Sequence, residues 1–131
     1  MNEAQRILNL ILKMMYYHEF KSSLTSDERD FIQSIRSSSF KHFRLSSLHD
    51  RSAIFTWESA MGQSVACYAN DSGFRFLEVV AYKTSTKRMK DREEEKLSPE
   101  KMEVVQAEIE ELKKIFRVYS ENPNDMETYF K

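Results

Sequence analysis

The sequence predicts an α+β fold with two N-terminal helices, an antiparallel meander of three or four strands, and a long C-terminal helix packed on the sheet. Three observations lead to this prediction. Apolar residues recur at helical spacing near both ends of the chain, branched and aromatic residues concentrate in its middle, and the connections between the middle segments are short.

A chain of 131 residues suits a single domain. We divide residues 1–131 into a helical part (1–38), a sheet (39–83), a charged loop (84–97), a long helix (98–120) and a tail (121–131). The hydrophobic share of 40% is enough to build a core.

The first helix is expected over residues 2–18. Its apolar residues recur at i, i+3, i+4 and i+7 from Ile7, and Leu8, Leu12 and Met15 widen this stripe. A helix that is apolar over so much of its surface must be buried on two sides. We therefore expect the domain to cover one side and a partner to cover the other.

A second, short helix is expected after Thr25. Thr25 and Glu28 have the spacing of a capping box, in which the hydroxyl accepts from the Glu28 N–H and the carboxylate reaches back. Phe31, Ile32 and Ile35 would form the inner face of this helix.

The middle of the chain predicts β-strands at residues 53–57, 64–69 and 74–82. Residues 61–63 and 70–73 have turn chemistry, with Gly73 available for a positive φ. A further strand at residues 40–45 is an open alternative, which leaves the sheet with three or four strands. Trp57 and Tyr68 are candidates for a cross-strand aromatic pair.

The long helix should begin at Ser98, with Pro99 at its first position, and end near residue 120. An apolar stripe follows it at alternating spacings of three and four: Met102, Val105, Ile109, Leu112, Phe116 and Tyr119. The stripe either covers one face of the sheet or forms a seam with a partner helix. Because three apolar helices exceed what so small a sheet can cover, we expect a homodimer that uses this stripe or the outer face of the first helix.

A basic segment over residues 36–51, together with residues 83–92 of the charged region that follows the sheet, predicts a different kind of partner, a nucleic acid. Its cationic residues are interleaved with serine and phenylalanine, which suits phosphate contacts and base stacking. Residues from the charged loop could join it in space. The candidate set for nucleic acid is Arg36, Lys41, His42, Arg44, Arg51, Lys87, Arg88 and Lys90. A metal-independent ribonuclease using His42 or His49 is a further alternative, and a solvated, ion-paired surface is the plain one.

Several classes are excluded or disfavoured. The formal net charge of −1 argues against a general polycation for nucleic acid. The single cysteine, Cys67, rules out an intramolecular disulfide and a cysteine zinc cluster, and its place within a strand predicts burial. With no histidine spacing for a metal and no glycine-rich phosphate loop, we expect no metal, no cofactor and no enzymatic activity.

The longest apolar stretch, residues 7–17, is too short to cross a bilayer, and no signal peptide is evident. We therefore expect a cytoplasmic protein that does not bind membranes. The leading hypothesis is a small non-enzymatic interaction protein (an adaptor, a chaperone-like protein or a regulatory subunit), and a nucleic-acid-binding regulator is the alternative.

Overall fold

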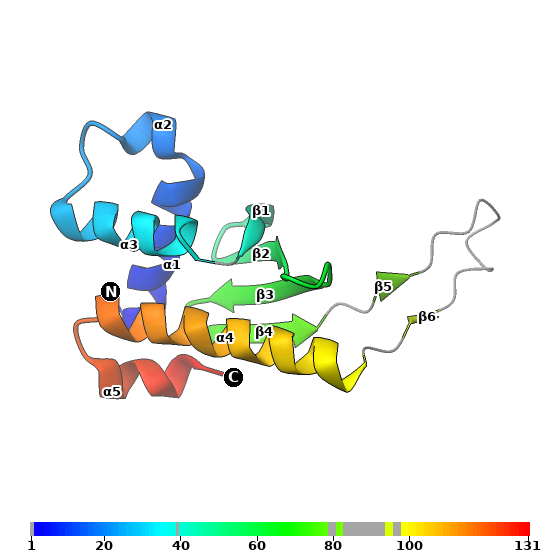
Figure 1. The fold of residues 1–131 in the computed structure, drawn as a ribbon. Helices are drawn as coiled ribbons and strands as arrows, with labels where there is room; N and C mark the ends of the chain where they lie inside the picture. Colours follow the sequence, from blue (N-terminus) through cyan, green and yellow to red (C-terminus); the bar gives the residue numbers. More distant parts are fainter. Residues whose placement is uncertain (1, 39, 79–80, 83–93, 96–97) are drawn as a thin grey trace.

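The computed structural model describes residues 2–38, 40–78, 81–82, 94–95 and 98–131 (Figure 1). The predicted α+β class is confirmed. In chain order the elements are α1 (Glu3–Met15), α2 (Tyr17–Phe20), α3 (Ser26–Arg36), β1 (Lys41–His49), β2 (Ser52–Glu58), β3 (Ser64–Asn70), β4 (Gly73–Glu78), β5 (Ala81–Tyr82), β6 (Glu94–Glu95), α4 (Pro99–Tyr119), α5 (Pro123–Met126) and a 3₁₀ turn (Glu127–Tyr129).

Strands β1 to β4 form an antiparallel meander in chain order, so the sheet has four strands and the alternative strand is present as β1. Residues alternate between its two faces. On β2, for example, Ala53, Phe55 and Trp57 are buried, whereas the residues between them are partly exposed. One face of the sheet is therefore covered and the other is open.

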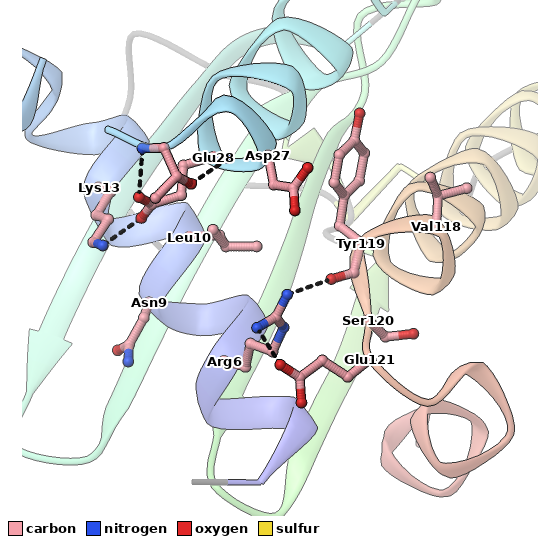
Figure 2. Close-up of a pocket in the computed structure, with 11 residues that line it drawn as sticks. Arg6, Asn9, Leu10, Lys13, Asp27, Glu28, Val118, Tyr119, Ser120 and Glu121 are labelled. Atoms are coloured by element: carbon pink, nitrogen blue, oxygen red, sulfur yellow. Dashed lines mark hydrogen bonds and ion pairs between the residues drawn. The ribbon is translucent and has the colours of Figure 1, made fainter. Parts of the chain in front are cut away.

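The helices lie on the covered face. Figure 2 shows α1 in front of the strands, with α3 and α4 beside it. Phe116 of α4 packs against both the sheet and α3. Its ring centroid is 4.9 Å from that of Phe74 on β4 and 6.3 Å from that of Phe31 on α3. Glu108 of α4 accepts hydrogen bonds from the Trp57 indole and the Ala60 backbone N–H, both at 3.0 Å.

The predicted helix starts are confirmed. Thr25 and Glu28 make both bonds of the capping box, at 2.9 and 3.2 Å, and Ser98 caps α4 by accepting from the Lys101 N–H. The first helix is shorter than expected because the backbone leaves helical geometry at Tyr16, which separates α1 from α2.

The segment predicted as one strand over residues 74–82 contributes to two different sheets. β4 ends at Glu78, and Ala81–Tyr82 pairs with Glu94–Glu95 in a separate two-stranded sheet that extends beyond the main one (Figure 1). That pairing also places a strand inside the segment predicted as a loop. Val79 and Val80 lie outside the described residues.

The C-terminal tail is a structured part of the fold. Within the segment predicted as a tail, Pro123 begins α5, and Met126 is fully buried. The last residues run beside β4, where the Lys131 N–H donates to the Phe74 carbonyl at 2.9 Å. The tail therefore pairs with the start of β4 at the edge of the sheet.

The expected Trp57–Tyr68 pair does not form. Trp57 is paired with Val65 and Tyr68 with Ile54, so the two aromatic side chains project from opposite faces. Trp57 is buried under the helices, and Tyr68 lies on the open face.

Candidate interaction surfaces

The apolar stripe of α4 belongs to the core of the single chain. Val105, Ile109, Leu112 and Phe116 are almost fully buried, because they cover the sheet. At the ends of the stripe, Met102 is 42% exposed, and the half-buried Tyr119 has its hydroxyl 3.0 Å from that of Ser34. Four of the six residues expected at a partner seam are thus not free to form one.

The expected excess of apolar helix surface was too large because the helices also bury one another. α3 packs against both α1 and α4, so apolar residues that the sheet does not cover are covered by a neighbouring helix. Leu8 of α1, expected at the interface, is 8% exposed.

Apolar side chains that are incompletely buried remain on α1 and on the outer strand, β1. The inward residues of β2 and β3 are fully buried, but Phe43 and Leu45 of β1 are only half-buried, and Leu48 is 47% exposed. On α1, Leu12 and Met15 are also half-buried. We call these five residues the α1–β1 margin.

A groove of about 430 Å³ lies at one end of this margin. Leu8 and Leu12 form its helix side, and Leu48 forms its strand side. Its rim is polar and carries charges of both signs, since Arg51, Asp50 and Asp71 all line it. The groove can hold an apolar side chain from a partner while its rim makes polar contacts.

Those basic residues predicted for nucleic acid that the structure describes do not form one patch. Arg36 stacks on the Tyr17 ring, 4.6 Å from its centroid, on the helical side. Lys41, His42 and Arg44 lie on β1, where His42 has a positive φ of 53° and its Nε2 is 3.5 Å from a Glu58 carboxylate oxygen. Arg51 lies in the turn after β1, at the groove.

The remaining members of that set, Lys87, Arg88 and Lys90, lie outside the described residues. The sequence prediction missed two open-face residues, Tyr68 and Arg75. Arg75 lies between the inward Phe74 and Phe76, so the period-2 alternation of this segment was a signal that could have placed it on the open face.

A polar cleft of about 930 Å³ separates α1 from the start of α3 and the end of α4 (Figure 2). Its cations face carboxylates. Arg6 donates to Glu121 at 3.0 Å, and Lys13 donates to Glu28. These ion pairs join different elements and neutralise the cations, so the cleft offers little charge to a ligand.

Glu28 has a shifted pKa. Desolvation raises the pKa of this carboxyl, but the hydrogen bonds from Lys13 and Thr25 together outweigh that effect and lower it below its ordinary value. The charged form of Glu28 is therefore part of the folded structure.

Cys67 is buried, and desolvation raises the pKa of its thiol well above the ordinary value. The neutral thiol is a poor nucleophile and a poor metal ligand. Within the part of the chain that the structure describes, no group of three or more metal-ligating side chains comes together.

Comparison of the chain with protein-family models, curated proteins and solved structures finds no match. Among the described residues, no helix has the length and apolar character needed to cross a membrane.

Proposed function

We propose that this protein is a small non-enzymatic interaction protein that forms a homodimer through the α1–β1 margin. The observation that carries the proposal is the uneven cover of the sheet. The helices bury the inward residues of β2 and β3 completely but leave Phe43 and Leu45 of β1 half-buried and Leu48 exposed, in a groove that Leu12 also lines. Exposed apolar side chains that adjoin a core favour association.

A second copy is the partner that requires no additional component. In a two-fold arrangement the same surface is used twice, so one apolar margin can cover another. Each end of the margin carries charges of both signs: Asp50 and Arg51 at the groove, and Glu19 and Lys21 beyond Met15. An antiparallel packing of two α1 helices can therefore place opposite charges together.

Continuous pairing of two β1 strands fits less well. β1 departs from regular pairing at two places, and its first half carries Lys41 and Arg44 without a carboxylate. Bulges and positive charges of this kind protect an edge strand from addition of another strand. The proposed contact therefore uses side chains of the margin rather than the backbone of its edge.

Sedimentation velocity at several concentrations tests the proposal. The wild type should sediment as a dimer, and the double variant Leu12→Glu, Leu48→Glu should sediment as a folded monomer, because both positions are exposed enough to accept a carboxylate. Val118→Glu is the matched control. Val118 is 66% exposed on α4 at the polar cleft, so the control should remain dimeric.

A wild type that is monomeric at the highest soluble concentration, or a double variant that stays dimeric, contradicts the proposal. A wild type that is monomeric alone but binds a different protein at the margin would contradict the homodimer specifically. Leu112→Glu is unsuitable as a test because Leu112 is fully buried, and a carboxylate there would unfold the chain.

A further inference from the structure

We propose that the open face of the sheet binds single-stranded nucleic acid, with Tyr68 stacking on a base and Arg44 and Arg75 contacting phosphates. This open sheet face consists of the outward residues of the four strands. Its members are Lys41, Arg44, Ser46, Ser47, His49, Ser52, Ile54, Thr56, Glu58, Ser64, Ala66, Tyr68, Asn70, Arg75 and Leu77. None of the margin residues belongs to it, so this site is separate from the proposed dimer contact.

The strand register places an aromatic ring at the centre of this face. Tyr68 lies on an inner strand, directly between Ile54 of β2 and Arg75 of β4. It is 39% exposed, and Leu77 on the neighbouring strand is 41% exposed. A tyrosine ring on an apolar floor is a surface on which a base of any sequence can stack.

Next to this aromatic ring, the outward residues of β1 and β2 supply a second cation and a hydroxyl group. Arg44 of β1 pairs with Thr56 of β2, whose hydroxyl is 2.9 Å from that of Ser46. A shallow hollow of about 280 Å³ lies beside this row, lined in part by Arg44, Thr56 and Ser64. Guanidinium and hydroxyl groups are common donors to phosphate oxygens.

The charge of the face suits a polyanion, although the whole chain has a formal net charge of −1. Among the described side chains, Glu58 is the sole carboxylate on this face, and it is already close to His42, with the nearest oxygen 3.5 Å from Nε2. No ion pair joins Arg44 or Arg75 to a carboxylate within the described part of the chain. Both guanidiniums are thus available for phosphate.

The same charges disfavour the other simple occupant, a second copy packed face to face. A two-fold packing of two open faces would bring Arg44 and Arg75 of both copies into one interface, with Glu58 as the nearest compensating group. Four guanidiniums facing so few carboxylates would be poorly paired and partly desolvated. A nucleic acid strand supplies the missing negative charge.

Fluorescence anisotropy with labelled mixed-sequence oligonucleotides of about 12 nucleotides tests the proposal. Single-stranded RNA and single-stranded DNA are separate arms, and a duplex of the same sequence is the third. The wild type should bind one or both single strands more tightly than the duplex. Tyr68→Ala should weaken that binding about tenfold, whereas Tyr68→Phe, which keeps the ring, should retain it.

The arginines should act through phosphate. Arg44→Ala and Arg75→Ala should each weaken binding to all sequences and lower the slope of log affinity against log salt by about 1. Arg51→Ala is the matched control, because Arg51 is exposed but lies at the groove on the other side of the sheet. It should change the affinity by less than about twofold.

Three results would overturn the proposal: no binding by the wild type at low salt, equal binding by wild type and Tyr68→Ala, or an equal loss in Arg51→Ala and Arg75→Ala. Sedimentation that becomes monomeric in Tyr68→Ala would assign this face to self-association and would also overturn it. The variant Leu12→Glu, Leu48→Glu should bind single strands in either case, so failure of the dimer proposal and failure of this one are distinguishable.

Discussion

Glu108 illustrates how a single buried polar residue positions the longest helix on the sheet. Its side chain is 4% exposed, and its two carboxylate oxygens accept from the Trp57 indole and the Ala60 N–H. The contact joins the middle of α4 to the end of β2 and the turn that follows. A buried carboxylate is retained at this place because two donors satisfy it.

We predict that Glu108→Ala lowers the free energy of unfolding by about 3 kcal/mol, because it leaves two buried donors without an acceptor. Glu108→Gln keeps one acceptor oxygen and should cost about half as much. Urea unfolding followed by fluorescence of Trp57, the one tryptophan in the chain, measures both effects.

Glu111→Ala is the matched control, because it also replaces a glutamate of α4 with alanine but at an exposed position. It should change stability by less than about 0.5 kcal/mol. If Glu108→Ala were equally mild, the two hydrogen bonds would not support the packing of α4.

For single residues in the sheet, the local sequence pattern does not determine which face a side chain occupies. Trp57 and Tyr68 were identified as aromatic residues of adjacent strands, but the register that separates them depends on the length of the intervening turn. A shift of one residue moves a side chain to the other face. The residues Tyr68 and Arg75 became a candidate site through register, which sequence alone does not determine.

At the scale of elements, segments with a repeated local signal were predictable. α4 has a cap, an N-terminal proline and a long apolar period, and it runs over Pro99–Tyr119, close to the expected range. α5 also has a cap, Asn122, and an N-terminal proline, Pro123, but with four residues it is too short to show an apolar period. Met126 is the one buried residue of this short helix and anchors it in the core. Long-range contacts of that kind leave no periodic trace in a short segment.

The contact between the tail and β4 depends on Gly73. This residue has a φ of +137°, and a Cβ placed on it would be 2.2 Å from the Tyr129 carbonyl oxygen. The close approach lets the chain end run beside β4, where the Lys131 N–H reaches the Phe74 carbonyl. Glycine is needed here for both conformation and space.

We predict that Gly73→Ala destabilises the protein by about 3 kcal/mol or more, because it adds backbone strain and displaces the tail. Gly62→Ala is the matched control. Gly62 also has a positive φ, of +82°, but the nearest atom to its added Cβ is 3.9 Å away. The control should cost about 1 kcal/mol. Thermal unfolding of both variants measures the difference, and equal losses would show that the tail does not depend on this close approach.

At the scale of the whole molecule, ion pairs add to the apolar packing that joins the helices to one another. Lys13–Glu28 connects α1 with α3, Arg6–Glu121 connects α1 with the segment after α4, and Arg117–Glu127 connects α4 with the final turn. The hydrogen bond from Arg117 lowers the pKa of Glu127, as the pairing with Lys13 helps to lower that of Glu28. Protonation of these two carboxylates should therefore weaken the ion pairs that they make.

The arrangement of the helices also explains why the apolar surface left for a partner is smaller than the sequence predicts. Local periodicity reveals how much of a helix is apolar, but it does not reveal which neighbour covers that surface. The pattern around Leu112 is the same for a helix on a sheet and for a helix in a seam. What remained for a partner could be located at Leu12, Met15 and Leu48 only after the helices were placed.

The Lys13–Glu28 pair gives the acid response a definite sign. The pKa of Glu28 in the folded protein is below its ordinary value of 4.5, so the unfolded chain binds more protons in this range. The stabilisation is therefore fully present above pH 4.5 and is lost as the pH falls through the lowered value.

We predict that wild type exceeds Glu28→Gln in unfolding free energy by about 1–2 kcal/mol at neutral pH. Urea titrations at a series of pH values should show this gap narrowing below pH 4.5. In a Lys13→Met background the gap should be smaller and less dependent on pH, because the cation that favours the carboxylate is gone. A gap that is constant or widens toward acid would mean that the charged pair does not hold α1 and α3 together.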